Sequence, residues 1–580
     1  MSWIYKVNRW LSYALLDQEI KDSLLEIKND ENRLEDCFYK DLEFGTGGIR
    51  GEIGPGTNRM NIYTVRKAAK GLSNYMINQG ETAKTRGIVI AYDSRNKSKE
   101  FALEVAKTVC QDGIRTFLFD ELRPTPELSF AVRYLNAFAG VVITASHNPP
   151  EYNGFKVYGE DGGQIPPTTV NEITRCIDKI KDELLIKVMD DRELLNSNLL
   201  TYIGEEIDLA YLEKLKVSQL NNASRKTAKD IKIVYTPLHG SAKNLVYEGL
   251  RSFGFENIYL VKEQESPDAN FATVHSPNPE EYAAFELAIQ YGEKIDADIL
   301  MATDPDGDRL GVAVKNDRGN YVILSGNQLG ALILHYILTQ KKEKRILPEN
   351  GVVIKTIVTS EIGRAIANDF GIRTIDTLTG FKYIGEKIKE FEKTKEYRFQ
   401  FGYEESYGYL ISEFVRDKDA VQAAVITAEI TSYYKMSGKS LIEGLYDIYK
   451  KYGFYQESLK TLTLKGNKGS NQINKLLSVF RESPPKEISG IWITSIEDYL
   501  TSKRINLRTG EESIIDLPKS NVLKFYLTDN SWFTLRPSGT EPKMKVYFSV
   551  VSTSLSESQL KLRKMENEVM KKVESIIATK

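Results

Sequence analysis

The sequence predicts an α/β fold in which three related mixed-sheet α/β domains precede a C-terminal α+β domain. Two patterns support this prediction. Short apolar strands alternate with helices of 3.6-residue periodicity in three separate stretches, each read as strand–helix–strand–helix–strand. After about residue 455, short strands and polar turns replace that alternation. Apolar runs bounded by turn residues are typical of strands buried on both faces, so we expect parallel pairing with right-handed crossovers in the first three domains.

The expected elements follow the chain in order. Strands and helices alternate in each of the three α/β stretches. The expected strands are 87–92, 115–119 and 140–144, then 232–235, 257–261 and 297–302, then 351–357, 373–378 and 398–403. The expected helices between them are 101–111 and 126–134, then 242–253 and 280–293, then 360–370 and 381–391. A polar linker is expected at 465–471, strands at 522–527, 532–536 and 543–550, and a final helix at 556–578. The corresponding domain boundaries are 1–205, 206–320, 321–455 and 456–580.

Composition narrows the class of protein. The 580 residues carry 78 Lys and Arg against 80 Asp and Glu, a net charge of −2, which excludes nucleic acid or an anionic membrane as the main partner. Three distant cysteines without a CxxC pair exclude a disulfide scaffold and favour a reducing cytoplasm. Charges at Lys6 and Arg9 indicate an amphipathic surface helix rather than a signal peptide. Apolar runs are far shorter than the roughly 20 residues of a membrane span.

A loop rich in aspartate, ATDPDGDRLG, directly follows the apolar strand at 297–302. Asp304, Asp306 and Asp308 alternate with a proline and a glycine, which exclude a regular helix. In an extended loop alternate side chains face the same way, so the three carboxylates can converge. Converging carboxylates repel one another unless a cation neutralises them, and hard oxygen ligands favour Mg²⁺ or Ca²⁺. The competing interpretation is a solvated acidic turn.

A second loop, TASHNPPEYNGFK, directly follows the strand at 140–144. Ser146 lies on the strand-to-loop turn, where its hydroxyl would face a cleft, but a serine alone is a weak nucleophile. No GxSxG elbow surrounds it, which argues against an α/β-hydrolase. A turn that merely caps the loop is the alternative. A phosphate carried on Ser146 would complete the shell of a metal held by the aspartates. His147 is either a base or a hydrogen-bond partner within the loop, and we favour the second.

Two further loops offer groups that suit a phosphorylated sugar. In GYEESYGY, Glu404 and Ser406 alternate and could share one side of a strand end, where a carboxylate and a hydroxyl suit sugar hydroxyls. In LRPSGTEPK, Arg536 and the hydroxyls of Ser538 and Thr540 surround a glycine turn and could wrap a phosphate. Ordinary exposed turns are the alternative in both cases.

The glycine-rich segment FGTGGIRG is neither a dinucleotide fingerprint nor a P-loop. Its Arg50 is an isolated cation beside flexible backbone.

The motifs TASHNP, DPDGDR, EESYG and RPSGTEP, in this order, resemble those of the α-D-phosphohexomutase family, which includes phosphoglucomutases and phosphomannomutases. The resemblance spans about residues 41–548. It implies a four-domain phosphohexomutase architecture with a central cleft. It also implies a cytoplasmic isomerase that acts on small sugar phosphates, as a monomer or homodimer. The EESYG loop favours reversible conversion of glucose 1-phosphate and glucose 6-phosphate, by way of glucose 1,6-bisphosphate. Phosphopentomutase and phosphomannomutase activity are the alternatives.

The resemblance also implies roles for individual residues. Ser146 would be the phosphorylated serine and would bind one Mg²⁺ together with Asp304, Asp306 and Asp308. The other roles would be active-site cation for Arg50, Lys156 and Arg309, proton transfer for Lys382, sugar binding for Glu404 and Ser406, and phosphate binding for Arg536, Ser538, Gly539 and Thr540.

Two other classes of function stay open. A catalytically silent paralogue would bind sugar phosphate or a protein partner without turnover. A serine-dependent phosphatase would release phosphate without forming the isomer. The chain is longer than compact members of that family, and the sequence assigns no role to the additional residues near 178–211 and 420–452.

Overall fold

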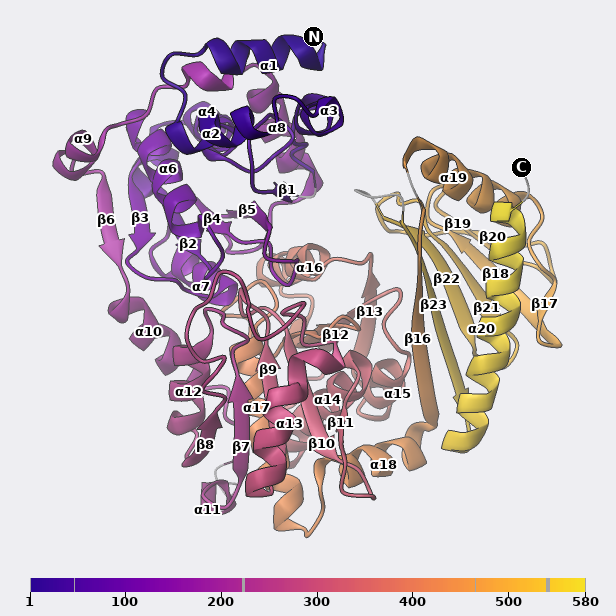
Figure 1. Ribbon diagram of the computed structural model, residues 1–580. Helices are drawn as coiled ribbons and strands as arrows, with labels where there is room; N and C mark the ends of the chain where they lie inside the picture. Colours follow the sequence, from indigo (N-terminus) through magenta and orange to yellow (C-terminus); the bar gives the residue numbers. More distant parts are fainter. Residues whose placement is uncertain (1, 46, 222–224, 465, 539–542, 579–580) are drawn as a thin grey trace. The chain divides into compact units, whose positions relative to one another are not determined.

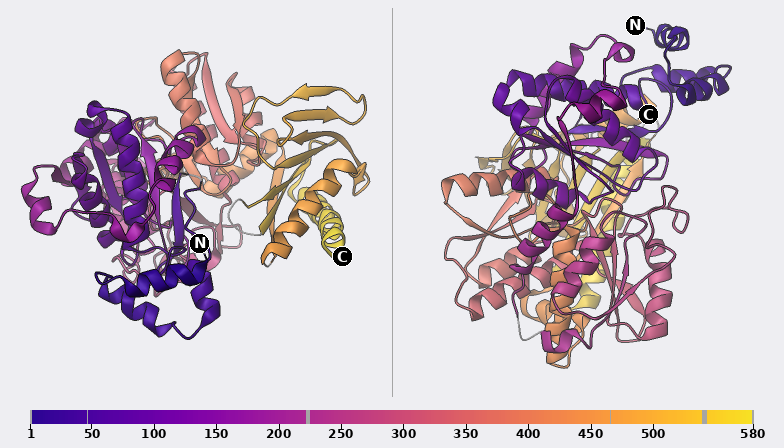
Figure 2. Two further views of the ribbon diagram at one scale, coloured as in Figure 1. Left: turned by 90° about the horizontal axis from the view of Figure 1, so that it is seen from above. Right: turned by 90° about the vertical axis from the view of Figure 1, so that its left-hand side faces the viewer.

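A computed structural model describes residues 2–45, 47–221, 225–464, 466–538 and 543–578 (Figure 1; Figure 2). The chain forms two compact parts. The larger part comprises Met1–Leu329, Tyr336–Val352 and Phe381–Ile442, and the smaller part comprises Gly330–His335, Val353–Gly380 and Glu443–Lys580. None of the helices in the described part of the chain combines the length and the apolar run needed to span a bilayer.

The first sheet of the larger part is mixed and has the order β1-β5-β4-β2-β3-β6. Strands β4, β2, β3 and β6 run parallel, whereas β5 is antiparallel to both β4 and β1. Strands β2 and β4 are buried along their whole length, as their apolar sequences predict. The strands are β1 (Gly48–Glu52), β2 (Ile88–Tyr92), β3 (Thr116–Phe119), β4 (Ala139–Ile143), β5 (Tyr152–Gly159) and β6 (Leu200–Ile203).

Helices α6 (Ser98–Gln111) and α7 (Thr125–Tyr134) pack on β2 and β4, and α4 (Ile62–Asn78) packs on α6 and α8 (Pro167–Asp178). Before this domain, α1 (Trp3–Ser12), α2 (Gln18–Glu26) and α3 (Glu31–Phe38) form a small helical layer. The ring of Trp10 is fully buried there against Phe38 and Tyr63. This confirms the amphipathic N-terminal helix.

The second sheet has the order β11-β10-β9-β7-β8. Strand β7 (Lys232–Thr236) runs parallel to β8 (Asn257–Leu260) and β9 (Ile299–Thr303), and β10 (Leu310–Lys315) returns antiparallel to β9 beside β11 (Tyr321–Ile323). The apolar pattern predicted β7, β8 and β9, but not the antiparallel return. The aspartate loop therefore joins two neighbouring strands.

The third strand–helix series appears in the predicted order along the chain, as β12 (Gly351–Thr356), α15 (Ile362–Asp369), β13 (Arg373–Thr377), α16 (Phe381–Thr394) and β14 (Arg398–Glu404). In the larger part, β14 pairs antiparallel with β15 (Gly408–Leu410). Helix α17 (Ala420–Met436) is mainly apolar and is buried on all sides, including the side chains of Gln422 and Glu429. It packs against α12 (Lys243–Ser252), β9, β10 and β15, so it forms the centre of this part.

In the smaller part, an antiparallel sheet has the order β16-β23-β22-β21-β18-β19-β20. Helices α19 (Gly466–Glu482) and α20 (Leu555–Ala578) contact each other and β23, so they cover the same face (Figure 2). The strands are β16 (Phe454–Thr463), β18 (Ile491–Asp498), β19 (Lys503–Asn506), β20 (Glu512–Ile514), β21 (Leu523–Leu527), β22 (Trp532–Pro537) and β23 (Lys543–Ser552).

The polar linker predicted at 465–471 is wrong, because α19 begins at Gly466. Ile473, Leu476, Leu477 and Phe480 recur at helical spacing and are buried against the sheet. Burial of that apolar face stabilises the helix, and the helix therefore begins before the face does, within the polar segment. The mixed α/β sheets and the antiparallel C-terminal sheet confirm the predicted fold class.

Candidate active site

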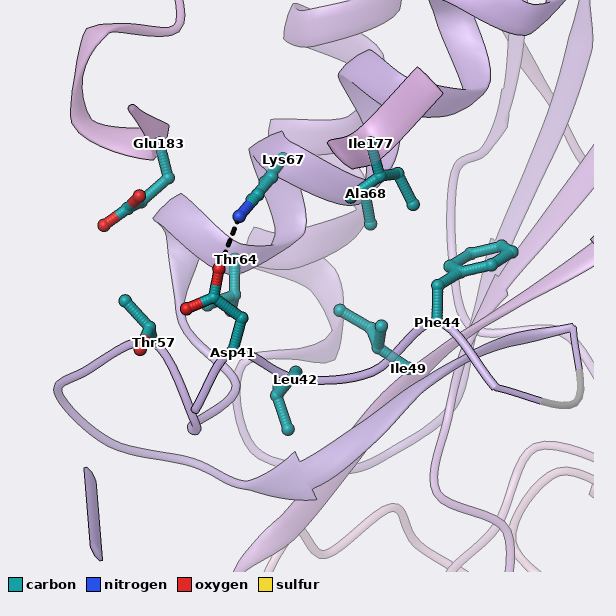
Figure 3. Close-up of a pocket in the computed structure, with 10 residues that line it drawn as sticks. All are labelled: Asp41, Leu42, Phe44, Ile49, Thr57, Thr64, Lys67, Ala68, Ile177 and Glu183. Atoms are coloured by element: carbon teal, nitrogen blue, oxygen red, sulfur yellow. Dashed lines mark hydrogen bonds and ion pairs between the residues drawn. The ribbon is translucent and has the colours of Figure 1, made fainter. Parts of the chain in front are cut away.

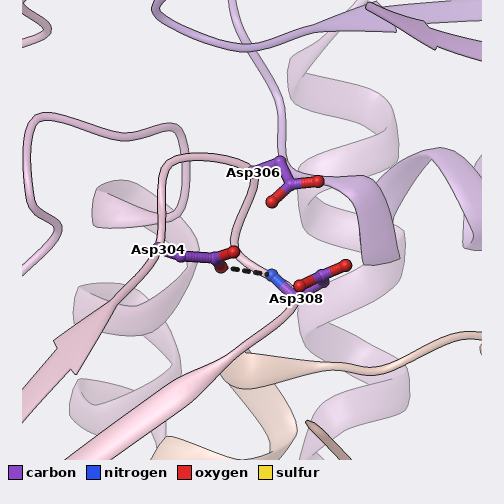
Figure 4. A group of neighbouring side chains, drawn as sticks. All are labelled: Asp304, Asp306 and Asp308. Atoms are coloured by element: carbon purple, nitrogen blue, oxygen red, sulfur yellow. Dashed lines mark hydrogen bonds between the residues drawn. The ribbon is translucent and has the colours of Figure 1, made fainter. Parts of the chain in front are cut away.

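The three aspartates of the loop between β9 and β10 converge, as the alternation predicts (Figure 4). Asp304, Asp306 and Asp308 are all buried, and one oxygen of each lies within 4.8 Å of the others. The backbone N–H groups of Asp308 and Arg309 donate to Asp304 Oδ1 at 3.1 and 3.0 Å. These hydrogen bonds hold the turn closed around the first carboxylate.

The tight turn of this loop requires glycine at position 307. Gly307 has φ +65°, a left-handed conformation that residues with a Cβ atom adopt at a cost. A Cβ atom there would lie 2.7 Å from Pro124 Cβ and 2.8 Å from Ala242 Cβ. Glycine thus allows the loop to pack closely against two neighbouring segments.

Two lysines partly balance the buried acids. Lys156 Nζ, on β5, lies 2.7 Å from Asp306 Oδ2. Lys418 Nζ, just before α17, lies 3.0 Å from Asp308 Oδ2. Burial and the neighbouring carboxylates raise the pKa of Asp304 well above its usual range. Burial also opposes ionisation of Asp306, but the lysines hold its pKa below its usual range. The three carboxyl groups thus share two close lysines, and Arg309 Nε lies 3.9 Å from Asp308 Oδ1.

The triad fits a divalent cation. Asp306 Oδ1 and Asp308 Oδ1 are buried and have no hydrogen-bond partner among the described residues. Unsatisfied buried carboxylate oxygens are costly, and oxygen atoms are the donors that Mg²⁺ prefers. These residues could therefore hold a metal ion.

Ser146 lies at the carboxyl end of β4 and faces the triad. Its Oγ donates a hydrogen bond to Asp304 Oδ2 at 2.7 Å, and its backbone N–H donates to Thr144 Oγ1 at 2.8 Å. A φ of +53° places this non-glycine residue in the left-handed region, which marks local strain. His147 Nδ1 lies 3.2 Å from the same hydroxyl oxygen, which is a contact within its own loop.

The serine loop is held by two arginines. Arg50 Nη1, on β1, donates to Asn148 Oδ1 at 2.8 Å. Arg95, which the sequence analysis missed, is buried and donates from Nη2 to the carbonyl oxygens of Ser146 and Asn148. Its signal was available, because Arg95 follows the buried strand β2 in a polar loop at the same sheet edge.

Lys418 was also missed. It lies between two aspartates directly before a helix, and Asp419 caps that helix. That pattern is typical of an ordinary helix start. Burial opposes the charge of Lys418, but Asp308 and Asp417 hold its pKa above the usual range.

The EESYG turn lies beside the aspartate loop. Leu310 N donates to Tyr407 O at 3.1 Å, and Arg309 forms an antiparallel bridge with Gly408. Glu404 ends β14 and is buried, and Ser406 follows in the turn. The structure thus places the predicted sugar-binding residues next to the predicted metal loop.

The predicted cations Arg309 and Lys382 have different neighbours, an acid for Arg309 and an aromatic ring for Lys382. Arg309 Nη1 lies 2.5 Å from Glu280 Oε1. Lys382 lies in the first turn of α16, with Nζ 5.1 Å from the centre of the Tyr383 ring. Its neighbour Phe381 places a ring 5.6 Å from Lys418 Nζ, so the start of α16 borders the site. Burial lowers the pKa of Lys382.

The predicted phosphate loop belongs to the smaller part. Arg536 Nη1 donates to Tyr547 Oη at 3.3 Å, and Ser538 N donates to Lys543 O at 2.8 Å. Gly539 and Thr540 lie outside the described residues.

Four family models match the chain in sequence order. Three are described as the alpha/beta/alpha domains I, II and III of phosphoglucomutase/phosphomannomutase and match residues 41–184, 210–319 and 325–452. The fourth, the C-terminal domain of phosphoglucomutase/phosphomannomutase, matches residues 487–561.

Similar proteins cover most of the chain. A phosphoglucomutase from Staphylococcus haemolyticus is 39% identical over 516 residues, which is 89% of this chain and 91% of that protein. One from Staphylococcus aureus strain USA300 is 38% identical over 561 residues, 95% of this chain and 99% of that protein. A crystal structure of a Burkholderia thailandensis phosphoglucomutase/phosphomannomutase family protein has a similar fold, with a TM-score of 0.65 at 18% identity and coverage of 92% of this chain and 98% of the other.

Proposed function

The chain belongs to the phosphoglucomutase/phosphomannomutase family, and on that premise we propose which of its residues carry out the reaction. The chain is an isomerase that transfers a phosphoryl group reversibly between glucose 1-phosphate and glucose 6-phosphate. The transfer passes through a phosphoserine and glucose 1,6-bisphosphate. The relatives named phosphoglucomutase support glucose over the mannose and pentose alternatives.

One observation carries the assignment of the site. The Ser146 hydroxyl, on a strained turn, lies 2.7 Å from a carboxylate of a buried acidic triad. A solvated acidic turn would not bury three carboxylates against a serine from another sheet. We assign the phosphoryl-carrying oxygen to Ser146 Oγ.

Asp304, Asp306 and Asp308 would hold one Mg²⁺ together with an oxygen on Ser146. When bound, the ion supplies positive charge for the oxygens of the transferring phosphoryl group. Lys156 and Lys418 add charge from the protein and keep the acids in place. Arg50 positions the serine loop through Asn148.

Phosphoryl transfer depends more on positioning and charge than on covalent chemistry by the protein. Glu404 accepts hydrogen bonds from sugar hydroxyls beside the serine, and Ser406 both donates and accepts them. Arg309 contributes a further cation there. Lys382, whose pKa is lowered by burial, takes the proton of the attacking sugar hydroxyl. Arg536, Ser538, Gly539 and Thr540 bind the phosphate that is not being transferred. We also propose the domain boundaries 1–205, 206–320, 321–455 and 456–580, a monomer or homodimer, and a cytoplasmic location.

The test compares kcat/KM for glucose, mannose and ribose 1-phosphates with Mg²⁺, in wild type and in Ser146→Ala. We expect glucose 1-phosphate to be preferred and turnover in the variant to fall by at least about 10³-fold, because the nucleophile is lost. Ser266→Ala, at an exposed serine, is the matched control and should keep full turnover. A preference for ribose would overturn the substrate assignment. Release of inorganic phosphate without isomer would indicate a phosphatase.

A further inference from the structure

A cavity in the larger part lies away from the acidic triad. It has a volume of ≈ 510 Å³ and is lined by the end of α14 (Gly326–Glu343), the end of α16 and the start of β14. Strand β14 runs from Arg398 at this cavity to Glu404 at the active site. At about 3.3 Å per residue the two ends are roughly 20 Å apart. The cavity is therefore a separate feature, of a size that holds a small ligand.

The lysine in this cavity is desolvated and has no acidic partner. Lys341 Nζ donates to Gln400 Oε1 at 2.9 Å. Among the residues that the structure describes, no carboxylate lies within ion-pair distance of it. An ammonium group has three N–H donors, so this bond leaves donors for a ligand. Burial lowers the pKa of Lys341 to about 8, although Glu413 acts to raise it.

Two exposed cations line the same cavity. Neither Lys395 nor Arg398 has a carboxylate within ion-pair distance in the described part of the chain. Of the two acids in the lining, Glu392 is already paired, with Arg416 at 2.7 Å and Arg133 at 3.2 Å. Three cations thus face one unpaired carboxylate, Glu413, and the cavity favours an anion.

The remaining lining is aromatic and aliphatic. Tyr397 packs edge-on against Phe391 with ring centres 5.1 Å apart, and Phe399 and Ile346 complete an apolar wall. Phosphate or sulfate alone would leave this wall without a partner. A ligand that combines an anion with a flat apolar group would contact both parts of the cavity.

Another hollow, lined by residues of β1, of the segment before it and of α4, differs from this cavity in how its charges are paired (Figure 3). It also contains a lysine, Lys67, but the ammonium lies 2.7 Å from Asp41. Lys6 lies 2.6 Å from the same carboxylate, which lowers the pKa of Asp41 to about 2 against the effect of burial. The charges of that hollow are neutralised from within, whereas those around Lys341 are not.

We propose that the cavity around Lys341 binds a nucleoside phosphate. The phosphate oxygens accept hydrogen bonds from Lys341, Lys395 and Arg398. The base lies against Tyr397 and Phe399, where aromatic stacking stabilises it. This site is independent of the proposed reaction at Ser146.

The test is calorimetric titration of the full chain with ADP, without added metal. Wild type should bind ADP, and Lys341→Met should weaken binding at least tenfold while removing little volume. Lys393→Met changes an exposed lysine of α16 outside the cavity and should bind like wild type. Arg398→Glu reverses a charge at an exposed position, so it tests the site even if Lys341→Met folds poorly. Glucose 1-phosphate turnover should be unchanged in all three variants, which separates this site from the proposed function.

Titrations with adenosine and with inorganic phosphate identify which part of the ligand is recognised. Each should bind at least tenfold more weakly than ADP. Hydrogen exchange should show protection by ADP at residues 391–400. Equal affinity for phosphate and ADP would overturn the proposal, as would equal weakening in Lys393→Met, absence of ADP binding, or protection elsewhere only.

Discussion

Each compact part of the molecule contains a cluster of buried charges, but the two clusters are balanced differently. In the smaller part, Lys355 Nζ lies 2.9 Å from Glu361 Oε1 and 3.1 Å from Asp376 Oδ1. Arg364 Nε lies 2.8 Å from Glu361 Oε2. Lys524 Nζ lies 3.9 Å from Glu361 and donates to Ile357 O at 2.6 Å. Every acid in this cluster faces at least two cations.

The cluster in the larger part lacks that balance. Three buried aspartates share two close lysines, whereas three cations surround the two acids of the smaller part. A buried charge without a partner is costly, whereas a fully paired cluster is tolerated within a fold. The comparison shows that an incomplete set of partners, rather than burial or acidity alone, distinguishes a ligand site from a structural ion pair.

Asp306→Asn should have the largest effect on the incomplete cluster. Loss of one charged oxygen ligand should lower kcat by about 10³-fold, equivalent to about 4 kcal/mol of transition-state stabilisation. Steady-state isomerisation of glucose 1-phosphate measures it. Asp296→Asn, at an exposed aspartate with a left-handed backbone that asparagine tolerates, is the control. Equal activity of the two variants would contradict the assignment.

Glu361→Gln should instead affect stability. The change leaves Lys355 and Arg364 facing a neutral amide, and breaking a buried ion pair typically costs about 3–5 kcal/mol. Urea unfolding followed by circular dichroism should show that loss, with turnover reduced much less than in Asp306→Asn. Glu487→Gln, at an exposed glutamate of the same part, should leave the unfolding curve unchanged. If Glu361→Gln lowered turnover but left the free energy of unfolding unchanged, the contrast between a structural cluster and a ligand site would be contradicted.

Mg²⁺ should stabilise the folded protein only by binding to the aspartate triad of the larger part. A cation present at 100 times its Kd adds about 2.7 kcal/mol to the free energy of unfolding. Thermal unfolding with Mg²⁺ and with EDTA should show this gain in wild type and in Glu361→Gln, but not in Asp306→Asn. A gain of the same size in Asp306→Asn would place the cation elsewhere.

The smallest expected effect is on the pH dependence of the free energy of unfolding. Burial lowers the pKa of Lys524 to about 8, whereas an unfolded chain keeps that proton to about pH 10.4. The unfolded state therefore binds more protons above pH 8, and the free energy of unfolding rises with pH. Between pH 8 and pH 9 the rise should be about 1 kcal/mol larger in wild type than in Lys524→Met. Lys519→Met, an exposed control, should keep the wild-type slope. Identical slopes in all three proteins would show that Lys524 does not titrate in this way.

Much of the fold was predictable because the buried strands are continuous apolar runs. The main components of the site were predictable as well, because Asp304 and Ser146 directly follow such strands. The contacts of Lys418 with Asp308 and of Arg95 with the Ser146 carbonyl arise only in the folded chain. Lys418 belongs to no pattern that distinguishes it locally, whereas Arg95 could have been found from its place after the buried strand β2. The start of α19 was missed because an apolar face further along the helix, rather than its own polar residues, stabilises it.

The central claim is that Ser146 carries the phosphoryl group beside the aspartate triad. Incubation with glucose 1,6-bisphosphate and Mg²⁺, followed by intact-mass analysis and peptide mapping, tests it directly. We expect a gain of one phosphate that maps to Ser146 and is absent from Ser146→Ala. A phosphate mapped to another residue, or isomerase turnover retained in Ser146→Ala, would contradict the claim.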